Sequence, residues 1–239
     1  MKKYNAVIPY TSALPNKHCL QALNTHFPYW RWLVSPASVR SFGKNREPLL
    51  YKHGYALDNG AYSYWNRNLD FPSDKFRTCV DRYGERADWI VLPDVIGDWQ
   101  ATNEFSNEWY EELRDVNQLL IVAQNGSEED NYRDLCAWID KGCGVFVGGD
   151  DEFKKAHTSS IIRLCKENGV ICHVGRVNSM KRATWCNNIG AFSFDGSGMA
   201  RFTKQANYMS RHMSSMHNQI SLLAVDDYIE NMQKKYDIS

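Results

Sequence analysis

The chain alternates between short apolar runs and longer stretches in which apolar residues recur every three or four positions. Short apolar runs bounded by turn residues are typical of buried strands, and the second spacing is typical of amphipathic helices. Strands are predicted at residues 5–9, 31–35, 55–58, 89–93, 118–123, 144–147, 170–174 and 191–194. Helices are predicted at residues 16–27, 72–83, 99–113, 128–139, 153–168, 179–186 and 199–216. Residues 38–50 are expected to form a loop or a short helix, and the tail from 217 ends in a polar amphipathic helix.

Strands that are apolar on both faces and alternate with helices predict a parallel sheet covered by helices. Eight such strands favour an α/β fold of the (β/α)8 TIM-barrel type, whose active site lies at the carboxyl ends of the strands. An open, doubly wound sheet is the alternative. It has less support, because no Gly-x-Gly-x-x-Gly segment follows a strand and no Walker-type lysine is present.

Polar or glycine residues stand where the predicted strands end. These residues are Asp58, Asp94, Gln124, the pair Gly148 and Gly149, and Asp195. Asp94, Gln124 and the backbone N–H groups of the two glycines would provide acceptors and donors along the edge of a guanine-like base. Asp58 and Asp195 suit glycosidic chemistry, in which one carboxylate attacks the anomeric carbon and another moves protons. Taken singly, each aspartate is more often a helix cap or a turn former, and a Gly pair is more often a turn.

The composition is that of a globular protein. Its 239 residues, 43% of them hydrophobic, are enough to build one core, so residues 1–239 are expected to form a single domain. No run approaches the roughly 18 apolar residues that cross a bilayer, and the N-terminus is too short in its apolar part for a signal peptide. We therefore expect a cytoplasmic protein with no membrane partner. Seven dispersed cysteines favour reduced thiols, and neither they nor the scattered histidines support a metal site.

The net charge is zero, but the charges are unevenly placed. From residue 70 to 152 there are 20 acidic and 7 basic residues, whereas from 154 to 211 there are 10 basic and 2 acidic ones. A polyanion would therefore bind over the C-terminal third, where Lys and Arg can neutralise phosphates. The candidates for phosphate contacts follow the last two strands: Arg176, Lys181, Arg182, Arg201 and Lys204. A solvated helix surface would carry the same bias, and charge alone does not separate the two interpretations.

Five motifs in a fixed order resemble the tRNA-guanine transglycosylase superfamily, most closely the short DpdA-type DNA-guanine transglycosylases of phages and bacteria. Residues 58–62 (Asp-Asn-Gly-Ala-Tyr) resemble the family's Asp-Ser-Gly-Gly-Phe segment, and Pro93-Asp94-Val95 resembles its base-recognising Asp segment. Residues 122–126 resemble its Val-Gln-Gly element, residues 147–149 its Gly-Gly-Leu element, and Phe194-Asp195-Gly196 the segment of its nucleophilic Asp. The chain departs from the family at Asn59, Ala61 and Asp150, and it lacks the zinc cluster of the tRNA enzymes.

The resemblance implies an enzyme that exchanges guanine in DNA for a 7-deazaguanine, such as 7-cyano-7-deazaguanine, through a covalent aspartyl-DNA intermediate. It implies Asp195 as nucleophile and Asp58 in proton transfer. Asp94, Gln124 and the two glycines would bind the base, and no cofactor would be needed. The partners would be DNA and the two bases, while a homodimer and accessory modification proteins stay open. The missing zinc region argues against tRNA as the substrate.

Three other functions stay open on the sequence. A tRNA-guanine transglycosylase would use the same chemistry, a non-catalytic nucleic-acid-binding relative would keep only the pocket, and a hydrolytic N-glycosidase would release guanine without replacing it. The aromatic residues Tyr62, Tyr64 and Trp65 fit ordinary packing and stacking on a flipped base equally well. His173, inside an apolar strand, is predicted to be a hydrogen-bonded core or rim histidine rather than a catalyst.

Overall fold

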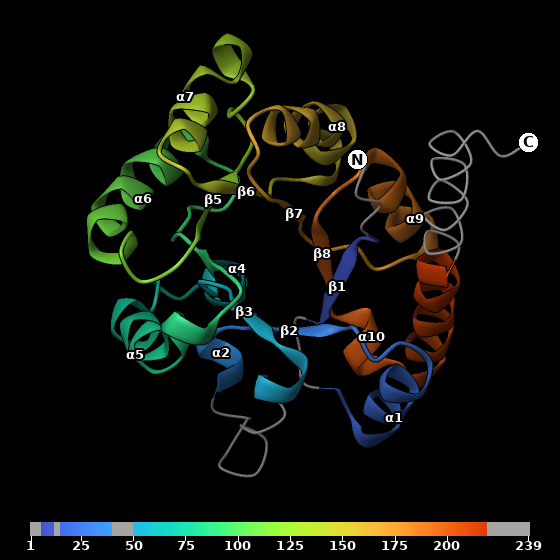
Figure 1. The fold of residues 1–239 in the computed structure, drawn as a ribbon. Helices are drawn as coiled ribbons and strands as arrows, with labels where there is room; N and C mark the ends of the chain where they lie inside the picture. The colour runs from blue at the N-terminus through green and yellow to red at the C-terminus, as the bar shows by residue number, and fades with distance from the viewer. Residues whose placement is uncertain (1–5, 12–14, 40–49, 219–239) are drawn as a thin grey trace, which may run out of the picture.

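A computed structural model describes residues 6–11, 15–39 and 50–218, and in it eight parallel strands close into a barrel (Figure 1). The strands are β1 (Ile8–Thr11), β2 (Arg31–Val34), β3 (Tyr55–Leu57), β4 (Ile90–Val91), β5 (Leu119–Ala123), β6 (Gly144–Val147), β7 (Cys172–Val174) and β8 (Ser193–Gly196). Each strand pairs with its neighbour in sequence, and β1 closes the barrel by pairing with β8 from Ile8 opposite Ser193 to Thr11 opposite Gly196. The predicted (β/α)8 TIM barrel is confirmed.

Helices surround the barrel, most of them on its outer side (Figure 1). They are α1 (Lys17–His26), α2 (Pro36–Val39), a helical segment at residues 50–53, α4 (Ala61–Trp65), α5 (Ser73–Tyr83), the 3-10 helix η1 (Gly84–Arg86), α6 (Trp99–Leu113), α7 (Glu129–Asp140), α8 (Asp151–Glu167), α9 (Met180–Ile189), α10 (Gly198–Arg201) and a helix at residues 203–218. Within the described residues, every helix is too short or too polar to pass through a lipid bilayer.

The strands are apolar on both faces because each face packs into a different core. Successive side chains of a strand point to opposite sides of the sheet. In β5, Leu120 and Val122 join a cluster inside the barrel, whereas Leu119 and Ile121 join the larger cluster between the strands and the helices. Trp89 also fills the interior cluster, so the barrel is a packed core below its mouth.

Side-chain caps set the start of several helices. The Asn16 side chain accepts a hydrogen bond from the Cys19 N–H (2.9 Å), which confirms the predicted cap of α1. Asp150 does the same for α8, because its Oδ1 accepts from the N–H groups of Glu152 (2.9 Å) and Phe153 (2.7 Å). Asp150 stands where the resembled family has leucine, and its task here is to cap a helix.

The structure corrects the sequence prediction at several places. The helix predicted at 199–216 is two helices, α10 and residues 203–218, separated by Phe202 in an extended conformation. The sequence pattern does not reveal α2 or α4. Asp195 lies within β8 and pairs with Tyr10, rather than following the strand. Most of the 38–50 region and the tail beyond 218 lie outside the described residues.

Candidate active site

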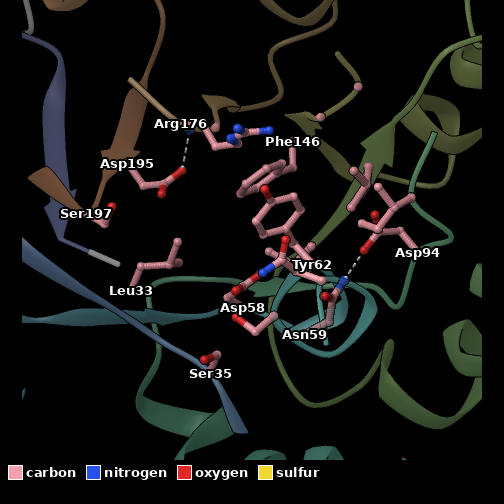
Figure 2. Close-up of a pocket in the computed structure, with 18 of the residues that line it drawn as sticks. Leu33, Ser35, Asp58, Asn59, Tyr62, Asp94, Phe146, Arg176, Asp195 and Ser197 are labelled. Atoms are coloured by element: carbon pink, nitrogen blue, oxygen red, sulfur yellow. Dashed lines mark hydrogen bonds between the residues drawn. The ribbon is translucent and has the colours of Figure 1, made fainter. Parts of the chain in front are cut away.

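A cavity of about 480 Å³ opens at the carboxyl ends of the strands. Its lining combines residues of β2, β4, β5, β6 and β8 with residues of the loops and helices that follow the strands from β2 to β8. Eight residues predicted from the sequence line it: Asp58, Asp94, Gln124, Gly148, Gly149, Arg176, Asp195 and Arg201. Figure 2 labels four of them, with Asp195 and Arg176 on the β8 side of the cavity, Asp94 on the β4 side and Asp58 after β3.

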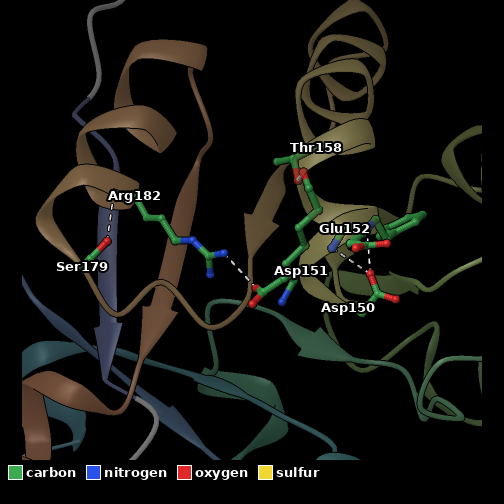
Figure 3. Close-up of polar contacts among 8 residues, drawn as sticks. Asp150, Asp151, Glu152, Thr158, Ser179 and Arg182 are labelled. Carbon is green, nitrogen blue, oxygen red and sulfur yellow. Dashed lines mark hydrogen bonds and ion pairs between the residues drawn. The ribbon is translucent and has the colours of Figure 1, made fainter.

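The other three predicted residues do not line the cavity. Arg182 binds Asp151 at the start of α8, with 2.8 Å between its Nη2 and the Asp151 Oδ1 (Figure 3). Lys204 lies over the ring of Tyr208, 5.9 Å from its centroid. Lys181 is exposed near the start of α9. If these side chains contact a nucleic acid, they do so outside the cavity.

Two amides hold the carboxylate of Asp94. Asn59 donates its Nδ2 to Asp94 Oδ1 (2.7 Å), and Gln124 donates its Nε2 to Asp94 Oδ2 (2.6 Å). Asn59 is itself fixed, because its Nδ2 also donates to the Leu92 carbonyl (2.6 Å) and its Oδ1 accepts from the Ala61 N–H (2.8 Å). Asn59 replaces a serine of the resembled family, and it immobilises the carboxylate that was predicted to read a base.

The backbone N–H groups of Gly148 and Gly149 were predicted to donate to a base, and the structure contradicts this. The Gly149 N–H donates to Gln124 Oε1 (2.9 Å), and the Gly148 N–H donates to the Ala123 carbonyl (3.0 Å). Both groups therefore already have acceptors and are not free donors for a base edge. The two glycines leave space instead, because a Cβ on Gly148 would stand 2.7 Å from Val122 Cγ1. Gly149 has a φ of +70°, which favours glycine.

One oxygen of Asp195 is held and the other is not. Its Oδ1 accepts from the Arg176 N–H (3.1 Å) and lies 3.3 Å from His173 Nε2. Among the described residues, Oδ2 has no hydrogen-bond partner. Arg176 reaches Asp195 with its backbone because its φ is +62°, a left-handed conformation that is uncommon for a residue other than glycine. Strained backbone of this kind clusters at functional sites.

His173 lies beneath Asp195 and is fully buried. Its Nδ1 is 2.8 Å from the Ser193 Oγ, and its ring stacks on Phe146 at 4.7 Å between centroids. Burial lowers the pKa of the imidazole. The neutral tautomer that fits both contacts donates from Nε2 to Asp195 and accepts from the Ser193 hydroxyl at Nδ1. The prediction of a hydrogen-bonded core histidine is confirmed, and the contact with Asp195 has no signal in the sequence.

Two carboxyl groups of the cavity have raised pKa values. Burial raises the pKa of Asp58 to about 7, and the negative charges of Asp195 and Asp94 add to this. Burial raises the pKa of Asp94 to about 6 although the amides of Asn59 and Gln124 favour its charged form. Asp58 is therefore the carboxyl group that can both give and take a proton near neutral pH.

Cations and aromatic rings form the rest of the lining. Lys154, at the start of α8, is buried and lines the cavity, and the sequence singled it out only as one of the basic residues of the C-terminal third. The guanidinium of Arg176 lies over the ring of Tyr62, 4.9 Å from its centroid. The ring of Tyr62 is 5.8 Å from that of Trp65, and both side chains are exposed. Stacking on a base remains a prediction for these rings.

The described residues contain no cluster of three or more His, Cys, Asp or Glu side chains that could hold a metal ion. All seven cysteines are free thiols, as predicted.

No protein-family model matches the chain, and no curated protein matches it.

Proposed function

We propose that this chain is a DNA-guanine transglycosylase, which exchanges guanine in DNA for a 7-deazaguanine through a covalent aspartyl-DNA intermediate. The observation that carries the proposal is that three carboxyl groups in one cavity differ in their hydrogen bonds and in their pKa values. Asp195 keeps one carboxylate oxygen free of hydrogen bonds from the described residues, Asp58 has a pKa of about 7, and Asp94 is held rigidly by two amides. Base exchange at an anomeric carbon needs a nucleophile, a proton carrier and a base reader, and these three residues supply them.

In the first half of the reaction, Asp195 attacks C1′ of a guanine nucleotide. A bond forms between a carboxylate oxygen and C1′ while the bond from C1′ to N9 breaks, and its electron pair leaves with guanine. Protonated Asp58 gives its proton to the departing base. In the second half, the 7-deazaguanine loses its N9 proton to Asp58 and displaces Asp195 from C1′. Two displacements retain the configuration of the sugar and regenerate both carboxyl groups.

The resemblance in motifs and the lack of the zinc cluster favour DNA over tRNA. Arg176 and Arg201 at the cavity add positive charge for the phosphates that flank an extruded nucleotide. Because the target base must leave the duplex to enter the cavity, unpaired or mismatched DNA is the better substrate under this proposal.

Exchange of labelled guanine into DNA and into tRNA tests the function directly. On a denaturing gel, the parent protein should form a covalent band with guanine-containing DNA. Asp195→Asn should lose both the band and the exchange, whereas Asp58→Asn should lower exchange and still bind DNA. A band that persists in Asp195→Asn but is absent in Asp58→Asn would reverse the two roles.

The same assays separate the alternatives. A DNA-binding parent with no band and no exchange would identify a non-catalytic binding protein. Release of guanine with no replacement base present, leaving abasic sites, would identify a hydrolytic N-glycosidase. Exchange into tRNA alone would identify the tRNA enzyme.

A further inference from the structure

Lys154 is a buried cation in the candidate active site. Its relative exposure is 7%, and its side chain lines the cavity at the start of α8. Within residues 6–11, 15–39 and 50–218, its ammonium group makes no hydrogen bond and no ion pair. An ammonium group that loses most of its hydration and gains no counterion is unfavourable. An anionic ligand in the cavity would supply the missing partner.

The two carboxylates whose charges favour the charged form of Lys154 form no ion pair with it among the described residues. Asp195 and Asp151 both favour the charged form of Lys154. However, Asp195 accepts hydrogen bonds at Oδ1 from Arg176 and His173, and Asp151 is bound by Arg182 (Figure 3). Neither comes within ion-pair distance of Lys154 in the described residues, so the ammonium group still lacks a counterion.

Most of the cations of the cavity lie on one side of it. Asp58 and Asp94 follow β3 and β4 and share their side with Arg67, whereas Lys154, Arg176 and Arg201 follow β6, β7 and β8. A ligand that fills the cavity therefore meets two carboxyl groups and one cation on one side and three cations on the other. The side with three cations, which also holds Asp195, suits a group that carries anionic oxygens.

We propose that Lys154 binds an oxyanion of the ligand, a phosphate or carboxylate oxygen, beside Asp195. The oxyanion belongs either to a phosphate of the nucleic acid or to an acidic substituent of the replacement base, and we call the molecule that bears it the carrier. This choice of carriers rests on the proposed function. Both carriers present the same chemistry to the ammonium group, and binding experiments separate them.

The first experiment uses sulfate, because its binding does not depend on base exchange. Lys154→Met removes the charge while keeping a long apolar side chain, and Lys155→Met is the matched control, since Lys155 is the next residue and is exposed. The parent and Lys155→Met should bind sulfate equally in isothermal titration at pH 7. Lys154→Met should bind it at least about tenfold more weakly, the loss expected for one charge-assisted hydrogen bond. Equal binding by Lys154→Met would contradict an oxyanion site for free anions.

A second set of ligands identifies the carrier. If the oxyanion is a nucleic-acid phosphate, Lys154→Met should abolish the preference for deoxyguanosine 5′-monophosphate over deoxyguanosine. If it belongs to the base, the variant should abolish the preference for a 7-deazaguanine bearing a carboxylate over unsubstituted 7-deazaguanine. A variant that binds sulfate as the parent does and preserves both preferences would overturn the proposal.

The oxyanion site and the proposed function can fail separately. If the parent protein binds sulfate through Lys154 but does not exchange bases, the proposed function is refuted and the oxyanion site is retained.

Stability and pH give readouts that a purely structural lysine would not produce. Removal of an unpaired buried charge should leave the melting temperature of Lys154→Met unchanged or higher. Burial lowers the pKa of Lys154 to about 8, against the charges of Asp195 and Asp151 and together with those of Arg176 and Arg182. Sulfate affinity of the parent should therefore fall as pH rises through about 8, whereas Lys154→Arg should keep only the smaller fall near pH 7 that ionisation of Asp58 in the same cavity causes. A destabilised Lys154→Met with unchanged anion binding would mean that the lysine is structural.

Discussion

Three aspartates at the strand ends differ in how their oxygens are held. Both oxygens of Asp94 accept hydrogen bonds from amides, so this side chain is rigid and presents a fixed pattern to a ligand. Asp195 is held through Oδ1. Desolvation of the half-buried Asp58 raises its pKa to about 7, and the charges of the other two aspartates add to this. Under the proposed function, the same residue type would supply recognition, nucleophilic attack and proton transfer in one cavity.

Replacement of Asp94 by alanine should weaken guanine binding. The donors of the base lose their acceptor, and the Gln124 amide loses its partner, which together cost about 1 to 3 kcal/mol, or roughly 5- to 150-fold in affinity. Equilibrium binding of guanine measures the effect. Asp140→Ala, at an exposed site on α7, is the control and should bind as the parent does. Parent-like affinity of Asp94→Ala would remove Asp94 from base recognition.

Replacement of Asp58 by asparagine should stabilise the protein at high pH. The folded-state pKa of about 7 lies above the ordinary value of 3.8, so the parent loses stability as pH rises from about 4 through 7. Asparagine cannot ionise and avoids this loss. The variant should match the parent near pH 4 and exceed it at pH 8 by up to about 4 kcal/mol. Denaturant unfolding at both pH values measures the difference, and a constant difference would contradict the raised pKa.

At the scale of elements, the segment after β7 positions the candidate nucleophile. Arg176 adopts its left-handed backbone so that its N–H points at Asp195 Oδ1. The next N–H, that of Val177, donates to the Asp195 carbonyl at 2.6 Å. The segment after β7 therefore contacts both the side chain and the backbone carbonyl of Asp195 in β8. The backbone conformation of Arg176, rather than its charge alone, should therefore matter for exchange.

Two substitutions at Arg176 separate backbone from charge. Arg176→Gly and Arg176→Val both remove the guanidinium, but only glycine accepts a φ of +62° without strain. Arg176→Val should be less stable than Arg176→Gly by about 1 to 2 kcal/mol and should exchange guanine more slowly. Thermal unfolding and the exchange assay give the comparison. Equal stability and equal rates in the two variants would mean that the backbone conformation is unimportant.

At the scale of the whole molecule, the acid-rich and base-rich parts of the sequence lie on different sides of the barrel. The acid-rich part of the chain builds the barrel from α5 to α7, and the base-rich part builds it from α8 onward (Figure 1). Lys181 and Lys204 are exposed on the base-rich side and lie outside the cavity. A long polyanion that enters the cavity with one residue would extend over this side.

Charge reversal at Lys181 and Lys204 should weaken DNA binding and flatten its dependence on salt. Each lost phosphate contact lowers the slope of log affinity against log salt by about 0.9. Affinity for free guanine should not change, because neither residue lines the cavity. The control is Lys75→Glu on α5, on the acid-rich side. Affinity measured between low and moderate salt tests the idea, and an unaltered slope would exclude these lysines from the DNA interface.

The order and type of the elements follow from the sequence alone. Helix α6 begins and ends where its apolar spacing predicts, at Trp99 and Leu113, and β6 covers residues 144–147 as predicted. Local periodicity is enough here, because burial on one face or on both faces of an element leaves a repeating pattern. The sequence also determines that polar residues end the strands. Parallel strands then bring those residues together at one mouth of the barrel.

Only the tertiary structure decides what those residues can do. The Gly149 N–H is occupied because Gln124, which is 25 positions earlier, places its Oε1 there. His173 meets Asp195 through packing between elements that are far apart in the chain. The same packing buries Lys154 without a counterion among the described residues. Hydrogen-bond partners, burial and pKa shifts depend on such distances in space, and no local pattern of residues encodes them.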